Sequence, residues 1–163
     1  MRNKFLLALV LISCMTACND NLVFSKFKTL ENGKWEMNKP VTFEFSSLDS
    51  IQAHNLFVNI RNDNTFPFSN LFLITELEYP NGKTLKDTLE YKMAEPDGKW
   101  LGKGLGSVKE NKLWLKEKIV FPDSGVYKLS IAHAMRKNGD VDGLHILDGV
   151  TDVGLEIEKS THE

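Results

Sequence analysis

Cys18 is the residue whose surroundings point most clearly to chemistry. It follows Met15-Thr16-Ala17, which places small residues directly before the cysteine and close to the amino terminus. A cysteine in this position is the general pattern by which bacteria mark lipoproteins. The thiol receives a diacylglyceryl group, and cleavage before the cysteine makes it the first residue of the mature chain. The pattern therefore predicts that Cys18 is lipidated.

The segment before Cys18 has the layout of a secretory signal peptide. Arg2 and Lys4 give it a positive amino end, and residues 5–12 form an unbroken apolar run. This run is too short for a membrane-spanning helix, which needs about 20 apolar residues. We therefore predict that residues 1–17 are removed and that acyl chains such as palmitate hold the exported domain on a membrane. Two or more such chains anchor stably where a single chain does not.

Cys14 offers an alternative lipidation site, because Leu11-Ile12-Ser13 before it fits the same pattern. Cys18 is preferred because cleavage there leaves a longer apolar region, and because the polar Asn19-Asp20-Asn21 that follows suits a tether. The sequence has no other cysteine, so the mature chain keeps at most one. It then has no disulfide, no cysteine nucleophile and no thiolate metal site.

The rest of the sequence carries none of the motifs that catalysis would need. A Gly-x-Ser-x-Gly turn is absent, and no His-Glu-x-x-His pair occurs among the four histidines, which are His54, His133, His145 and His162. We therefore expect no enzymatic activity, no cofactor, no metal site and no small-molecule substrate.

Two glycine-containing segments match ligand-binding loops only in part. Residues 102–106, Gly-Lys-Gly-Leu-Gly, lack the spacing and the following helix of a phosphate-binding loop, so a bulged or kinked strand is favoured. Residues 138–143 space Asp140 and Asp142 as calcium loops do, but the rest of that loop pattern does not follow. A solvated turn is favoured there, with calcium binding as the alternative.

Aromatic residues supply the remaining binding candidates. Residues 62–70 are polar except for Phe66, Pro67 and Phe68. The two phenylalanines form either a docking knob for a partner or a plug on the end of the core. The three tryptophans either pack in the core and between strands or form a platform that stacks on sugar rings; they are Trp35, Trp100 and Trp114. Phe66, Phe68 and Trp100 are therefore the possible partner or glycan contacts.

The composition is that of one globular domain, with 42% hydrophobic and 26% charged residues. The formal net charge of −2 at pH 7 leaves no basic excess for binding nucleic acid. A chain of this length buries roughly 70% of its unfolded surface. We therefore expect the fold to rest on packing alone.

Apolar and polar residues alternate with a period of two along most of the sequence, which predicts strands rather than helices. The expected strands are residues 41–46, 55–61, 70–79, 85–93, 112–121, 126–133 and 151–158. Pro80-Asn81-Gly82 suits a tight turn that joins two of them into a hairpin.

These strands predict an all-β fold, a single antiparallel β-sandwich. Residues 123–127, Asp-Ser-Gly-Val-Tyr, are typical of the tyrosine corner of immunoglobulin-type sandwiches. An immunoglobulin-like sandwich without the disulfide is therefore the first choice of topology, and a jelly roll is the second. The expected organisation is a signal peptide (1–17), a lipidated tether with a first strand (18–30) and the β-sandwich domain (31–163).

Several short segments, taken together, also resemble a known family. They are residues 18–21, 57–62, 69–74, 87–91, 98–102, 108–113, 134–136 and 152–155, beginning with Cys18-Asn19-Asp20-Asn21. Through them the chain resembles the H-type gliding-motility lipoproteins of Bacteroidetes over nearly all of its mature length.

The resemblance implies a non-enzymatic cell-envelope lipoprotein that supports gliding motility and the associated type IX secretion apparatus through contacts with envelope proteins. It implies a lipid anchor at Cys18, and the outer membrane is the expected location, on its periplasmic or its surface face. The alternative is a lipid-anchored glycan-binding module that uses surface tryptophans. Nucleic acid is not expected as a partner.

Overall fold

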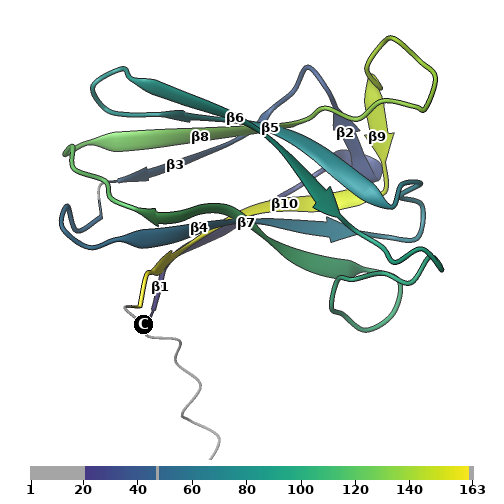
Figure 1. The fold of residues 1–163 in the computed structure, drawn as a ribbon, viewed down its shortest axis with the longest axis horizontal. Helices are drawn as coiled ribbons and strands as arrows, with labels where there is room; N and C mark the ends of the chain where they lie inside the picture. Colours follow the sequence, from purple (N-terminus) through teal and green to yellow (C-terminus); the bar gives the residue numbers. More distant parts are fainter. Residues whose placement is uncertain (1–20, 47, 162–163) are drawn as a thin grey trace, which may run out of the picture.

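Two antiparallel β-sheets lie face to face in the computed structural model, which describes residues 21–46 and 48–161 (Figure 1). Within these ranges, no helix has the length and apolar character needed to cross a bilayer. The elements in chain order are β1 (Leu22–Thr29), the 3-10 turn η1 (Glu31–Gly33), β2 (Lys34–Glu36), β3 (Val41–Ser46), β4 (His54–Asn62), β5 (Asn70–Glu78), β6 (Thr84–Lys92), β7 (Lys109–Ile119), β8 (Val126–His133), β9 (Ile146–Asp148) and β10 (Val150–Lys159).

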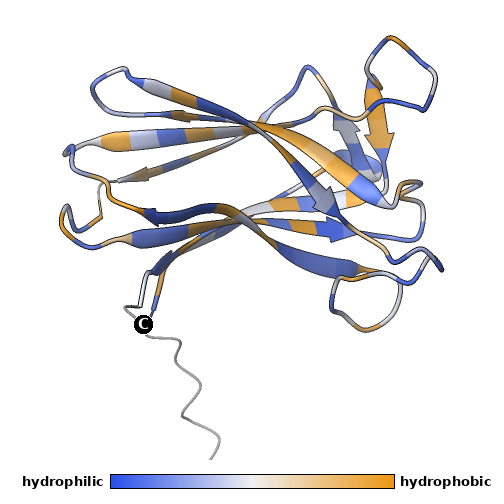
Figure 2. Cartoon of the chain, viewed as in Figure 1, coloured by the Kyte–Doolittle hydropathy of each residue, from blue (hydrophilic) through white to orange (hydrophobic). Residues whose placement is uncertain are grey.

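The strands form because apolar residues recur at the two-residue period of a pleated sheet. In β3, Val41, Phe43 and Phe45 are buried, whereas the residues between them are not. Figure 2 shows the same alternation of apolar and polar residues along other strands. Gly82 adopts a φ of +82° in the turn between β5 and β6, a conformation that glycine takes without strain. The expected strands and hairpin are confirmed.

The order of strands in the sheets is that of a jelly roll. One sheet has the order β1-β10-β4-β7, the other has β3-β8-β5-β6, and β2 and β9 form a small third sheet. The long strands alternate between the two large sheets, except for the β5–β6 hairpin. An immunoglobulin-like fold would instead place its first two strands in one sheet. The antiparallel β-sandwich is confirmed, and the jelly roll replaces the immunoglobulin-like arrangement as its topology.

The tyrosine corner is present even though the topology differs. Tyr127 is fully buried, and its hydroxyl accepts a hydrogen bond from the Asp123 amide and donates one to the Asp123 carbonyl, both at 3.0 Å. Its ring packs against Phe45 and Phe121, with centroid distances of 5.6 and 4.9 Å. The motif stabilises a turn between strands of different sheets. Such a crossover occurs in both topologies, so the motif cannot distinguish them.

The core fills the space between the two sheets, and one open edge of the sandwich is also bridged. Fully buried apolar side chains from both sheets include Leu56, Val58, Ile60, Leu71, Leu73, Ile131, Val153 and Leu155. At the edge, the Tyr91 hydroxyl on β6 donates to the Trp114 carbonyl on β7 at 2.5 Å. Burial, with a smaller contribution from Asp87, raises the pKa of Tyr91 to about 12. The hydroxyl therefore stays protonated and holds the two edge strands together.

The two ends of the sandwich carry different loops. β1 begins at one end, named here the tether end, where the Lys159 amide donates to the Asn21 carbonyl at 2.8 Å. The opposite end, named the far end, carries the β4–β5, β6–β7 and β8–β9 connections (Figure 1). The eight steps between the nine residues of a strand such as β4 span about 26 Å at 3.3 Å per step. The two ends therefore lie about that far apart.

Candidate functional site

Cys18, the expected lipidation site, lies outside the described residues. It stands four positions before Leu22, where β1 begins at the tether end. Lipidation of Cys18 therefore stays a prediction. The described part of the chain shows only at which end of the domain an attached lipid would lie.

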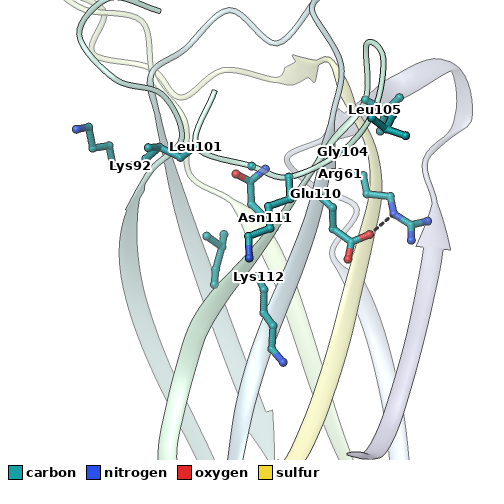
Figure 3. Close-up of a pocket in the computed structure, with 12 residues that line it drawn as sticks. Arg61, Lys92, Leu101, Gly104, Leu105, Glu110, Asn111 and Lys112 are labelled. Atoms are coloured by element: carbon teal, nitrogen blue, oxygen red, sulfur yellow. Dashed lines mark hydrogen bonds and ion pairs between the residues drawn. The ribbon is translucent and has the colours of Figure 1, made fainter. Parts of the chain in front are cut away.

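A groove of about 790 Å³ opens at the far end, between β7, the end of β4 and the connection from β6 to β7 (Figure 3). Its lining combines apolar and basic side chains with one carboxylate. The apolar ones are Leu101, Leu105, Val108 and Leu113, the basic ones are Arg61, Lys92, Lys103 and Lys112, and the carboxylate is Glu110. These residue types can bind a partner through apolar contacts and through charges.

Residues 103–110, named here the far hairpin, form a short hairpin. Its second arm is the beginning of β7, and its first arm is the chain segment that leads into it. The backbones of Lys103 and Glu110 exchange two hydrogen bonds, each 2.8 Å long. Gly104 has a φ of +150°, and a Cβ there would lie 2.6 Å from the Val108 carbonyl oxygen. The glycines of this segment therefore serve a tight turn of the backbone, and not the bulged or kinked strand expected from the sequence. Leu105, at the tip, is 100% exposed.

Two buried asparagines fix the base of the groove. Asn111 on β7 donates its Nδ2 hydrogens to the Ile60 carbonyl at 3.2 Å and to Asn62 Oδ1 at 2.9 Å. A Cβ on Gly102 would lie 2.8 Å from Asn111 Oδ1, so the loop passes directly over this amide. The amide pair thereby connects β7 to β4 by hydrogen bonds, and the loop that contains Gly102 packs directly against it.

Most charges of the groove are paired within the protein. Arg61 Nε lies 2.7 Å from Glu110 Oε2, and the Arg61 guanidinium lies 4.1 Å from the centre of the Phe27 ring. Lys92 pairs with Glu95. Among the described residues, the Lys103 side chain makes no ion pair. Lys103 is therefore the cation of the groove that is most available to a partner.

Lys112 joins the groove to the outer face of the sheet that contains β10. Its Nζ donates to Glu156 and Glu158, and it lies 4.1 Å from the centre of the Phe57 ring. Burial lowers the pKa of Lys112, but the hydrogen bonds to the two carboxylates outweigh burial and raise it. Burial raises the pKa of Glu156, and the hydrogen bonds from Lys112 and Asn59 outweigh it and lower the pKa. Lys112 and Glu156 therefore stay charged at neutral pH, and the network of hydrogen bonds links β7 to β10.

The two expected phenylalanine contacts have different positions. Phe66 is only 3% exposed and closes the far end of the core, as the plug alternative proposed. Its ring centre lies 6.0 Å from that of Phe68 and 6.1 Å from that of Trp100. Phe68 and Trp100 are half-buried, and Phe68 lines a second groove beside the β8–β9 connection. Of these three residues, Phe68 and Trp100 retain surface that a partner can reach.

The three tryptophans do not share one platform, because each packs against a different partner. Trp35 is 1% exposed, and its ring lies 5.6 Å from His133. Trp100 packs against the plug, and Trp114 lies 4.3 Å from Phe57 on the outer face of β7 with 53% of its surface exposed. Trp114 is thus the tryptophan best placed to stack on a ligand.

Residues 138–143, the other segment considered as a ligand loop, form turns in the β8–β9 connection. Across residues 21–46 and 48–161, no three His, Cys, Asp or Glu side chains gather closely enough to hold a metal ion.

Sequence comparisons group the chain with a set of motility lipoproteins. The sequence model of a family described as GldH lipoprotein matches residues 22–157. A protein of Christiangramia forsetii named gliding motility lipoprotein GldH homolog is 49% identical over 156 residues, covering 96% of this chain and 93% of the relative. The gliding motility lipoprotein GldH of Flavobacterium johnsoniae is 43% identical over 158 residues, covering 97% of each.

Likeness to solved structures is remote. The VP2 subviral particle of infectious bursal disease virus superposes with a TM-score of 0.40 at 14% sequence identity, and the match covers 86% of this chain and 33% of the viral one.

Proposed function

Because the chain belongs to the GldH lipoprotein family, we propose that it is a non-enzymatic, lipid-anchored envelope protein that serves gliding motility by binding other envelope proteins. The proposal extends to support of the type IX secretion apparatus and to a location on the outer membrane. Cys18 is the residue that carries the anchor.

The observation that carries the proposal is the opposite placement of the tether and the groove. Four Cα-to-Cα steps separate Cys18 from Leu22, so their Cα atoms are at most about 14 Å apart. An anchor at Cys18 therefore keeps the tether end at the membrane surface. The groove and the far hairpin then lie on the side of the domain that faces away from the membrane, where a partner can reach them.

The lining of the groove suits a protein partner with apolar and acidic groups. Leu101, Leu105 and Val108 offer apolar surface, and the unpaired Lys103 offers a positive charge beside them. Residues 98–109 contain three lysines and no acidic residue. Confinement to a membrane raises the effective concentration of the domain near its partners, so a modest interface is sufficient.

Site-specific photocrosslinking tests this use of the far hairpin. A photoreactive amino acid replaces Leu105 in one variant and Val141 in the control, because Val141 is 91% exposed on another far-end loop. We expect crosslinking to envelope protein from position 105 in native cells and much less from position 141. Adding Lys103→Glu should reduce the product, whereas Lys137→Glu, on the control loop, should not. Equal products from both positions would contradict the assignment.

A glycan-binding function remains the second candidate because Trp114 is exposed beside Phe57 and Lys112. A glycan-binding function predicts a different result in the crosslinking experiment. No protein would crosslink at position 105, and glycans would be retained in a way that depends on Trp114.

A further inference from the structure

The tether end carries apolar side chains that no described residue covers. Five of them are between 38% and 88% exposed: Leu22, Val23, Ile51, Val120 and Val126. They come from the first residues of β1, the connection before β4, the residue after β7 and the first residue of β8. We name these five residues the tether rim. Single exposed apolar residues are ordinary, but five at one end of a small domain indicate a contact surface.

Strand pairing places these segments at the same end of the sandwich. Leu22 pairs with Glu158 of β10, and the next residue of β10, Lys159, pairs with His54. His54 also pairs with Ile119, which Val120 follows. In the other sheet, Val126 pairs with the last residue of β3, Ser46. The Ser160 amide donates to the Ala53 carbonyl at 2.8 Å, which holds the segment after Ile51 at this end as well.

The chain itself indicates what covers the tether rim. The inference rests on the proposed lipid anchor at Cys18, whose Cα lies within about 14 Å of that of Leu22. The polar headgroup region of one leaflet is about 5–8 Å thick. An anchored domain therefore holds its tether end against the headgroups. We propose that the tether rim inserts its apolar side chains into the headgroup region of the same bilayer and orients the far end away from it.

The charges near the tether rim favour an apolar contact over an electrostatic one. Lys118 and Lys159 lie at this end, but Asp49, Glu117 and Asp123 do as well. Because both signs are present, binding to anionic headgroups would gain little. The rim should therefore contact neutral and anionic bilayers equally.

Fluorescence quenching on lipid vesicles tests the proposal with the full lipidated protein. Acylation at Cys18 would leave the mature chain without a free thiol, so one added cysteine gives one labelling site. A fluorophore is placed at Ile51→Cys, Val126→Cys or the far-end control Val141→Cys, and the protein is reconstituted in phosphatidylcholine vesicles that contain headgroup-quencher lipids. We expect quenching at positions 51 and 126 several-fold stronger than at position 141, and unchanged by added phosphatidylglycerol.

Flotation of the same samples separates failure of the anchor from failure of the rim. If the protein does not float with vesicles, the lipid anchor is refuted and the rim contact with it. If it floats but positions 51 and 126 are quenched no more than position 141, the anchor holds and the rim contact is refuted. Quenching that appears only with phosphatidylglycerol would refute the apolar contact. A further variant, Val120→Cys with Ile51→Ser and Val126→Ser, should lose most of the quenching seen at position 120 alone.

Discussion

Two buried histidines make the stability of the domain depend on pH. His54 and His133 are each 1% exposed, and burial lowers the pKa of both. The Met135 amide donates to His133 Nδ1, so the other ring nitrogen, Nε2, donates to the Trp35 carbonyl at 3.0 Å. The folded state therefore holds His133 as a neutral ring.

The sign of the effect follows from where the proton binds more readily. The unfolded chain takes up protons near pH 6.5, whereas the folded chain does so only at lower pH. The two neutral histidines therefore make their full contribution to the free energy of unfolding above about pH 6.5. Below that pH the free energy of unfolding falls, by up to about 1.4 kcal/mol per pH unit for each histidine. We predict that urea unfolding between pH 7.5 and 5 shows this loss. His133→Gln should reduce the slope, and the exposed His145→Gln should leave it unchanged; an unaltered slope in His133→Gln would contradict the assignment.

The amide pair under the groove predicts a second effect at the residue scale. Asn111→Ala leaves Asn62 Oδ1, which is fully buried, without the hydrogen bond from Asn111. A buried acceptor left unpaired costs about 1–3 kcal/mol. We predict a loss of this size in the free energy of unfolding, measured in urea. Asn138→Ala, at an exposed position, is the matched control, and an equally small change in both variants would show that the amide pair does not hold the site.

At the scale of elements, the far hairpin depends on its glycines. Gly104→Ala places a Cβ against the Val108 carbonyl at a strained φ, whereas Gly106→Ala meets no atom within 4 Å and only the φ of +77° opposes it. We predict that Gly104→Ala speeds hydrogen exchange of the Lys103 and Glu110 amides more than Gly106→Ala does. Protection that is equal in the two variants would mean that the hairpin tolerates the added methyl group.

The sequence contained enough information for the elements but not for the order of the strands. Alternation predicted the strands because one face of each lies on the core, and Asn81-Gly82 predicted the hairpin. The tyrosine corner formed as expected, but it reports a local crossover and not which sheet each strand joins. The short strands β2 and β9 had no signal, because three residues are too few to show a period.

The site was harder to predict than the fold. Phe66 and Phe68 are alike in sequence, yet only the packed structure shows that one is a plug and the other borders a groove. The glycines of residues 102–106 were expected in a bulged or kinked strand, whereas they form a tight turn. These glycines help to form a hairpin with Leu105 at its tip. The position of that hairpin depends on the pairing of β7 with β4, which are far apart in the sequence, so a local glycine pattern does not reveal it.

At the scale of the whole molecule, the proposed function gives a different role to each end of the domain. A lipid at Cys18 would hold the tether end on the membrane, and the tether rim would fix the tilt of the domain. The far end would then present the groove and the far hairpin to envelope proteins. Family membership supports a role in gliding motility, and the opposite placement of the two ends supplies a physical route to it.

Complementation of a gene deletion in native cells tests the central claim most directly, with the gliding speed of single cells and the secreted proteome as readouts. We predict that the deletion impairs both, that the wild-type chain restores them, and that Cys18→Ala does not although the protein is made and exported. Leu105→Glu with Lys103→Glu should also fail, whereas Val141→Glu with Lys137→Glu should restore both. Full rescue by Cys18→Ala, or normal gliding and secretion in the deletion itself, would contradict a membrane-anchored role in the motility machinery.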